Sequence, residues 1–252
     1  MPWYVGSERL HCASACGEIY WNNPPPRRRA IKFYPMFTPE LIAKLEPARL
    51  AAVLTIENSD DAVPVARALF AGGVSVIELA FRTPQAAEAI RRIRQDVPEV
   101  TVGAGTLLNP KHVEEAVAAG AAFGVAPGCN PRTIRAAQDR GFPFAPGIAT
   151  PTDIEIAVEH HCNVLKFFPA ETSGGLPHLN NIATPFAHLG LRYIPLGGIN
   201  TGNLATYLRS PLVACVGGSW LAKPEVIHRR DWEAIRRTAA EAMTIVHSIQ
   251  TK

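Results

Sequence analysis

The sequence predicts an α/β protein, a single (β/α)8 (TIM) barrel with an N-terminal capping helix. From residue 51 onward, short β-branched runs alternate with helical patterns about every 20 to 25 residues, which is typical of right-handed βα units on a parallel sheet. The chain has 252 residues, and single α/β barrels commonly reach about 250. The alternative architecture is a doubly wound open sheet.

Short apolar runs with the length and composition of buried strands recur along the chain. In order, the predicted strands are Ala52–Ile56, Ser75–Leu79, Thr101–Gly103, Ala122–Ala126, Phe142–Ala145, Val164–Phe168, Arg192–Leu196 and Val213–Val216. These are eight strands, the number that closes such a barrel.

Capping residues indicate the helices between these strands. Thr38, Asn109 and Thr150 are predicted N-caps, and a proline follows each at the first helical position. Ser59 and Thr83 are predicted to precede the helices that follow the first two strands.

Glycines follow three of these helices, at Gly72-Gly73, Gly120 and Gly141, where a left-handed residue ends a helix. We expect the helix after Thr38 to cover the bottom of the barrel and the helix over 232–249 to close its outside.

Composition narrows the class of protein. The chain is 47% hydrophobic and 19% charged, which suits a globular enzyme and excludes a disordered or collagen-like chain. No apolar stretch is long enough to span a membrane. The net charge is only +3 and the basic residues are scattered apart from 27–29, so neither a nucleic-acid partner nor a membrane partner is predicted.

The cysteines are an odd set that lies mostly far apart in the sequence: Cys12, Cys16, Cys129, Cys162 and Cys215. Reduced thiols in a cytoplasmic protein are the simplest interpretation. No second ligand pair with suitable spacing follows the first two, so no metal site is predicted.

Residues 1–35 show neither helical nor strand periodicity and contain a proline run and an arginine run. We expect a disordered tail, or a true start at Met36, directly before the first well-patterned helix. The predicted domain is therefore 36–252.

Lys166 is the most informative residue, because it lies in the apolar run Val164–Pro169 that should form a buried strand. Desolvation favours the neutral amine over the ammonium ion, and the neutral amine attacks a carbonyl carbon to form a Schiff base. The alternative is a lysine that extends its ammonium group into water or pairs with a carboxylate.

Polar residues and glycines follow the C-terminal ends of the predicted strands, where the catalytic groups of such a barrel lie. Gly197-Gly198 and Gly217-Gly218 follow strands seven and eight, which is a common phosphate-binding position, and Ser219 adds a hydroxyl donor. The alternative is that these glycines only form tight turns.

Glu78 on strand two and Lys166 on strand six should both face the barrel mouth, where a carboxylate can relay protons beside a Schiff-base nitrogen. The alternative is a buried ion pair, which is an expensive way to stabilise a core. The Arg82 guanidinium group can bind a carboxylate through two hydrogen bonds, and the Thr106 hydroxyl can donate to the same carboxylate. The alternative is that either side chain faces the surface.

The chain resembles the 2-keto-3-deoxy-6-phosphogluconate (KDPG) and 4-hydroxy-2-oxoglutarate (KHG) aldolases, which are lysine-dependent class I enzymes. The resemblance spans residues 45–248 and rests on segments in or next to most of the predicted strands. They are Ala71-Gly72-Gly73-Val74, Val76-Ile77-Glu78, Arg82-Thr83, Val102-Gly103-Ala104-Gly105-Thr106, Pro127-Gly128, Pro146-Gly147-Ile148, Lys166-Phe167-Phe168-Pro169-Ala170-Glu171, Gly197-Gly198-Ile199 and Gly217-Gly218-Ser219-Trp220. The lysine segment together with both glycine pairs, in this order, is the specific combination.

The resemblance implies a role for each matching residue. Lys166 would form the Schiff base and Glu78 would act as general acid and base. The remaining implied residues surround the two ends of the substrate: Arg82, Thr106, Pro127 and Phe168 at the pyruvyl group, and Gly197, Gly198, Gly218 and Ser219 at the phosphate. Some members carry an arginine in the first strand where Thr55 stands here. The resemblance also implies that no metal or other cofactor is needed, and that the protein is a homotrimer.

The implied activity is cleavage of KDPG to pyruvate and glyceraldehyde 3-phosphate, and also of KHG to pyruvate and glyoxylate. One alternative is the corresponding aldolase for the galactonate-derived substrate, which differs in stereochemistry at C4. The other is a phosphate-binding barrel without lysine chemistry.

Overall fold

The computed structural model describes residues 36–250, and in this part of the chain all strand pairs are parallel. The strands are β1 Leu50–Leu54, β2 Val76–Ala80, β3 Thr101–Gly105, β4 Gly124–Val125, β5 Phe144–Ala145, β6 Gly147–Ile148, β7 Val164–Phe167, β8 Arg192–Pro195 and β9 Val216–Gly218. The prediction for residues 1–35 lies outside the described residues.

The strands close into a ring. One sheet has the order β5-β4-β3-β2-β1-β9 and the other the order β6-β7-β8. Only Pro146 separates β5 from β6, and its carbonyl still accepts a hydrogen bond from the Lys166 N–H at 2.8 Å. Parallel bridges from Tyr193 to Val213 and from Leu196 to Gly217 join β8 to the segment that contains β9. The predicted barrel is confirmed and the open-sheet alternative is excluded.

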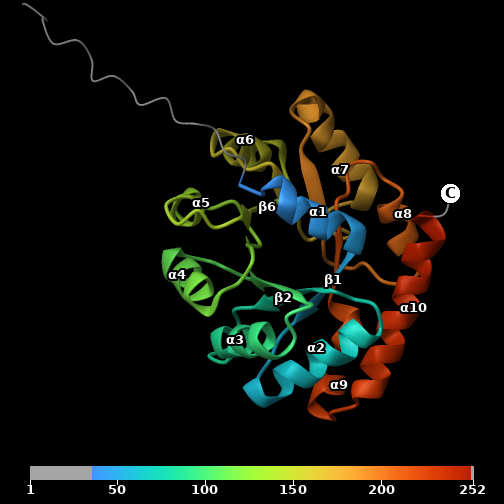
Figure 1. Cartoon of the computed structure of the whole chain (residues 1–252). Coiled ribbons are helices and arrows are strands. Elements are labelled where there is room, and N and C mark those ends of the chain that lie inside the picture. Colours follow the sequence, from blue (N-terminus) through green and yellow to red (C-terminus); the bar gives the residue numbers. More distant parts are fainter. Residues whose placement is uncertain (1–35, 251–252) are drawn as a thin grey trace, which may run out of the picture. The chain divides into compact units, whose positions relative to one another are not determined.

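Helices surround the ring, as Figure 1 shows. Those that alternate with the strands are α2 Ala62–Ala71, α3 Ala86–Asp96, α4 Pro110–Ala119, α5 Pro131–Gln138, α6 Pro151–Glu159, α7 Gly175–Ala183 and α8 Leu204–Leu208. After β9 come α9 Pro224–His228 and the long α10 Trp232–Gln250, and the 3₁₀ segments are η1 Ser59–Asp61, η2 Thr184–Leu189 and η3 Ser219–Ala222. No helix in the described range has the length and apolar character that crossing a membrane requires.

The first helix, α1 Pro39–Ala48, closes one end of the barrel (Figure 1). The Thr38 hydroxyl accepts the Leu41 N–H as predicted. Phe37, Leu41 and Leu45 are buried in one cluster with strand residues such as Val76 and Val164. The predicted cover of the barrel bottom is therefore confirmed.

The predicted N-caps at Asn109 and Thr150 are also confirmed, and Thr150 forms a full capping box with Asp153. The prediction for Ser59 is wrong, because Asn58 accepts the Asp60 N–H and Ser59 is the first residue of η1. Thr83 does not cap α3, since its hydroxyl donates to the Ile56 carbonyl at 2.5 Å. A short polar side chain that can cap a helix can equally bond to the loop after another strand, and the tertiary structure determines which of the two bonds forms.

Two strand predictions are displaced by two or three residues. The first strand begins at Leu50 instead of Ala52, immediately after Arg49 ends α1 in a left-handed conformation. The last begins at Val216 instead of Val213, because pairing with β1 starts at Val216.

Of the predicted helix-ending glycines, Gly73, Gly120 and Gly141 have positive φ, with values of 94°, 82° and 58°. Gly72 has φ −84°, and the close approach of α10 explains why a glycine stands there. A Cβ at position 72 would lie 2.5 Å from the Cβ of Ala239. The helix α10 thus packs on α2 and closes the outside of the barrel as predicted.

Candidate active site

Lys166 and Glu78 meet inside the barrel, from β7 and β2. The Lys166 Nζ lies 2.9 Å from the Glu78 Oε1, and the two side chains are only 5% and 7% exposed. The predicted contact is confirmed, and the alternative in which the ammonium group extends into water is excluded. Taking two charges out of water costs several kcal/mol per ion, so a buried pair is a weak stabilising device and its position favours a chemical role.

Glycines on neighbouring strands make room for this pair. A Cβ at Gly105 of β3 would lie 2.2 Å from the Glu78 Oε1, so any side chain there would displace the carboxylate. Gly147 is in register with Lys166, and a Cβ there would lie 2.2 Å from the Pro127 carbonyl oxygen. Gly105 is therefore required by close packing against Glu78, and Gly147 by the close approach of the Pro127 backbone beside the strand that carries Lys166.

The Phe168 ring lies beside the lysine, with its centroid 5.5 Å from the Nζ. Thr106 follows β3 directly and has φ 59°. A left-handed β-branched residue is strained, and such strain concentrates at functional sites. Phe168, Thr106 and Pro127 are half-buried, and each follows the C-terminal end of its strand. The structure therefore brings these three predicted residues to the same end of the barrel as the Lys166–Glu78 pair.

Arg82 also follows its strand at this end, but its side chain is exposed. None of the hydrogen bonds and ion pairs recorded among residues 36–250 involves its guanidinium group. The structure therefore does not bring Arg82 into contact with Lys166 or Glu78.

The two predicted phosphate loops are adjacent, because Leu196 bridges to Gly217. Gly197 and Gly198 have φ 105° and 81°, which favours glycine at both positions. Gly218 is required by packing, since a Cβ there would lie 2.3 Å from the Trp220 ring. Ser219 is exposed, and its hydroxyl has no partner among the described residues. These four predicted residues therefore lie together.

The sequence interpretation missed several residues that support the Gly197-Gly198 loop. Asn200 and Asn203 donate from their side-chain amides to the Gly198 carbonyl at 3.4 and 3.3 Å. Glu171 accepts from the Tyr207 hydroxyl. The Asn-x-x-Asn spacing after the glycine pair was a usable signal for a polar turn, whereas nothing local marked Tyr207.

The described cysteines are free thiols at Cys129, Cys162 and Cys215. Burial raises the pKa of each to about 12. They are therefore protonated at neutral pH and unsuited to act as nucleophiles.

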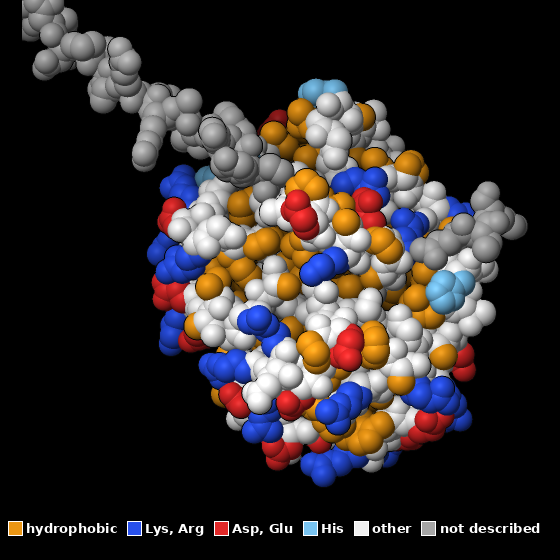
Figure 2. All heavy atoms as spheres, in the orientation of Figure 1, with side chains coloured by type: hydrophobic (Ala, Val, Ile, Leu, Met, Phe, Trp, Pro, Cys, Tyr) orange, Lys and Arg blue, Asp and Glu red, His pale blue; other side chains and the backbone are white. Residues whose placement is uncertain are grey.

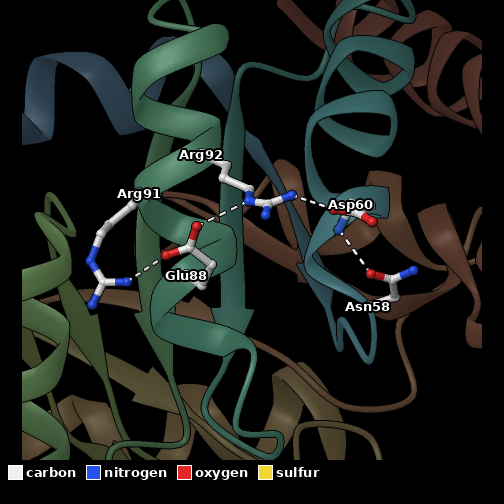
Figure 3. A network of polar contacts seen from close by, with 5 residues as sticks. All are labelled: Asn58, Asp60, Glu88, Arg91 and Arg92. Atoms are coloured by element: carbon white, nitrogen blue, oxygen red, sulfur yellow. Dashed lines mark hydrogen bonds and ion pairs between the residues drawn. The ribbon is translucent and has the colours of Figure 1, made fainter.

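An exposed ion-pair network lies at the rim, between the segment after β1 and the helix after β2 (Figure 3). Glu88 binds Arg92 at 3.0 Å and Arg91 at 2.7 Å, and Arg92 also pairs with Asp60. The hydrogen bonds from Arg92 and then Arg91 lower the pKa of Glu88. This network ties η1 to α3 and makes no contact with the buried pair.

Charges on the face seen in Figure 2 are of both signs and interspersed, with hydrophobic atoms between them. This face therefore lacks the continuous basic patch that favours a nucleic-acid partner.

A closed parallel barrel with a buried lysine and carboxylate facing each other defines the class of lysine-dependent barrel enzymes. The family model for KDPG and KHG aldolase matches residues 41–238, and the chain belongs to this family of class I carbon–carbon lyases.

Similar proteins cover most of the chain. A 2-dehydro-3-deoxy-phosphogluconate aldolase of Treponema pallidum is 43% identical over 202 residues, which is 80% of this chain and 95% of that protein. A Zymomonas mobilis KDPG aldolase crystal structure with 3-phosphoglycerate has a TM-score of 0.74 and 39% identity, covering 80% of this chain and 94% of that one. A Legionella pneumophila KDPG aldolase, with pyruvate captured as a covalent carbinolamine, has a TM-score of 0.76 and 35% identity, covering 82% and 98%.

Proposed function

We propose that this protein cleaves KDPG to pyruvate and glyceraldehyde 3-phosphate through a Schiff base on Lys166. The observation that carries the proposal is the Lys166–Glu78 pair, buried in the barrel with its atoms 2.9 Å apart. The names of the similar proteins support the same substrate.

The geometry supports a reaction in which Glu78 relays every proton. The Lys166 ammonium gives a proton to Glu78 across their hydrogen bond, and the free amine attacks the C2 ketone. Protonated Glu78 then donates to the leaving hydroxyl, and loss of water forms the iminium. The Glu78 carboxylate next removes the C4 hydroxyl proton, the C3–C4 bond breaks, and its electrons pass to the iminium nitrogen.

Glyceraldehyde 3-phosphate leaves at this stage and the enamine remains on Lys166. The proton held by Glu78 returns to C3, and water hydrolyses the resulting iminium to pyruvate and the Lys166 ammonium, which restores the ion pair with the Glu78 carboxylate. All the groups that these steps need are present on the chain.

We assign the remaining predicted residues to the two ends of the substrate. Thr106, Pro127 and Phe168 surround the pyruvyl group, and Arg82 reaches its carboxylate by rotation of an exposed side chain. The loops that contain Gly197, Gly198, Gly218 and Ser219 hold the phosphate.

Borohydride trapping with pyruvate tests the proposed chemistry. Reduction should add a stable pyruvyl group to one peptide, and mass spectrometry should locate it on Lys166. Folded protein that binds sugar phosphates but forms no adduct would instead indicate a phosphate-binding barrel without lysine chemistry.

Ser219→Ala should raise KM for KDPG by roughly tenfold, because a hydrogen bond to a charged phosphate is lost. The KM for KHG, which has no phosphate, should rise less. Steady-state kinetics with both substrates measures the difference, with Ser248→Ala on the exposed face of α10 as the matched control. Equal effects on both substrates would contradict the phosphate assignment.

The preferred stereochemistry at C4 is a separate question. Kinetic assays of KDPG and its galactonate-derived epimer, carried out side by side, decide it.

We also propose a homotrimer in the cytoplasm. The resemblance to the family supports the trimer, and sedimentation equilibrium of the purified protein measures it. The free, buried thiols at Cys162 and Cys215 support a reducing compartment.

A further inference from the structure

The segment 169–175, which follows β7, lies directly against the Gly197-Gly198 loop. The Ala170 N–H donates to the Leu196 carbonyl at 2.8 Å, and the Glu171 N–H donates to the Gly197 carbonyl at 3.0 Å. A Cβ at Gly198 would lie 2.6 Å from the Cβ of Glu171. The loop assigned to the phosphate therefore rests on the backbone and side chain of Glu171.

Hydrogen bonds to the carbonyls orient the peptide groups of this loop. The Gly197 carbonyl accepts from Glu171, and the Gly198 carbonyl accepts from Asn200 and Asn203. In a trans peptide the N–H points away from its carbonyl, so the N–H groups of Gly198 and Ile199 point away from these donors. Neither N–H has an acceptor among the described residues, which leaves both available to an anion.

Glu171 carries a carboxylate on the side chain that packs against Gly198. Its side chain is exposed, and a carboxylate that turned towards the loop would repel a phosphate. One carboxylate oxygen accepts the hydroxyl of Tyr207, a residue of α8 that is only 2% exposed. Burial, and then this hydrogen bond, raise the pKa of Tyr207, so its hydroxyl is a permanent donor at neutral pH.

We propose that Tyr207 is a positioning residue for the phosphate end of the substrate, and that it acts by holding the Glu171 carboxylate away from the Gly197-Gly198 loop. The inference rests on the proposed function, since it concerns the phosphorylated substrate of the same site. It assigns Tyr207 and Glu171 a role in selecting phosphorylated over unphosphorylated keto acids.

Tyr207→Phe removes only the hydroxyl. The KM for KDPG should rise about tenfold, kcat should stay within about twofold, and KM for KHG should not change. The matched control is Tyr193→Phe, which deletes a hydroxyl from another buried tyrosine outside this contact and should leave both substrates unaffected. A lower kcat, or an equal KM change for both substrates, would show a merely structural role and overturn the proposal.

Glu171→Gln tests whether the negative charge of Glu171 is the reason that loss of the Tyr207 hydroxyl raises KM for KDPG. The amide oxygen still accepts from Tyr207, so this variant should bind KDPG at least as tightly as the wild type. In Tyr207→Phe/Glu171→Gln the charge is absent, and KM for KDPG should return to within about threefold of that of Glu171→Gln. Additive effects would overturn the proposal. Glu171 is exposed, so Glu171→Gln should fold even if Tyr207→Phe does not. A raised KM for KDPG in Glu171→Gln would by itself overturn the proposal.

Borohydride trapping separates this inference from the proposed function. Wild type that forms no pyruvyl adduct would overturn the proposed function and the role of Tyr207 with it. A normal adduct on Lys166, together with unchanged KM values in Tyr207→Phe, would overturn the role of Tyr207 alone.

Discussion

Lys166→Ala is expected to abolish KDPG cleavage, with a loss of more than about 10⁴-fold in kcat/KM. The variant has no amine to condense with the C2 ketone, so the iminium that accepts the electrons of the C3–C4 bond cannot form. The borohydride adduct should disappear together with the activity. A coupled assay for pyruvate release measures the first effect, and intact-protein mass spectrometry measures the second.

The same variant should also lose stability, because Glu78 is left buried without its partner. Breaking a buried pair in this way typically costs about 3–5 kcal/mol, so a denaturant titration must accompany the kinetics. Lys166→Arg keeps a cation near Glu78 without an amine and should be folded but inactive. Lys111→Ala, which removes an exposed lysine paired with Glu115 on α4, should be fully active. Near-normal turnover in either Lys166 variant would disprove the Schiff-base mechanism.

Glu78→Gln should lower kcat by about 10²- to 10⁴-fold, the usual contribution of a general acid–base group. The amide oxygen can still accept a hydrogen bond from Lys166, so the fold should remain. The amide cannot carry the protons that dehydration and C3–C4 cleavage require. Rapid-quench kinetics with KDPG should show slow cleavage, and the pyruvyl adduct should still form on Lys166 with longer incubation.

Glu88→Gln is the matched control for this prediction, because it makes the same chemical change in the exposed rim network (Figure 3). It should leave kcat and KM unchanged. If Glu78→Gln kept wild-type kcat while remaining folded, another group would have to relay the protons and the role of Glu78 would be wrong.

Local signals predicted much of the fold. Asn109 and Thr150 were recognisable as caps because a short polar side chain precedes a proline and a helical pattern. The error at Ser59 arose because the neighbouring Asn58 can also cap, and the error at Thr83 arose because its hydroxyl bonds to the distant Ile56 carbonyl. The prediction ended the fifth strand at Ala145 and missed β6, because Pro146 lacks the N–H of a continuous strand and the pairing of Gly147–Ile148 with β7 arises only in the assembled sheet.

The sequence by itself determined the alternation of strands and helices, the buried position of Lys166 and the glycines at the strand ends, because apolar periodicity and backbone freedom are local properties. The tertiary structure decided which residues meet. Lys166 reaches Glu78 across 88 positions of chain, Arg82 remains exposed, and Tyr207 of α8 binds Glu171 in the segment after β7. The sequence placed Glu78 and Lys166 at the same end of the barrel, but their distance and the contact of Tyr207 depend on strand register and ring closure, which arise from pairing between distant segments.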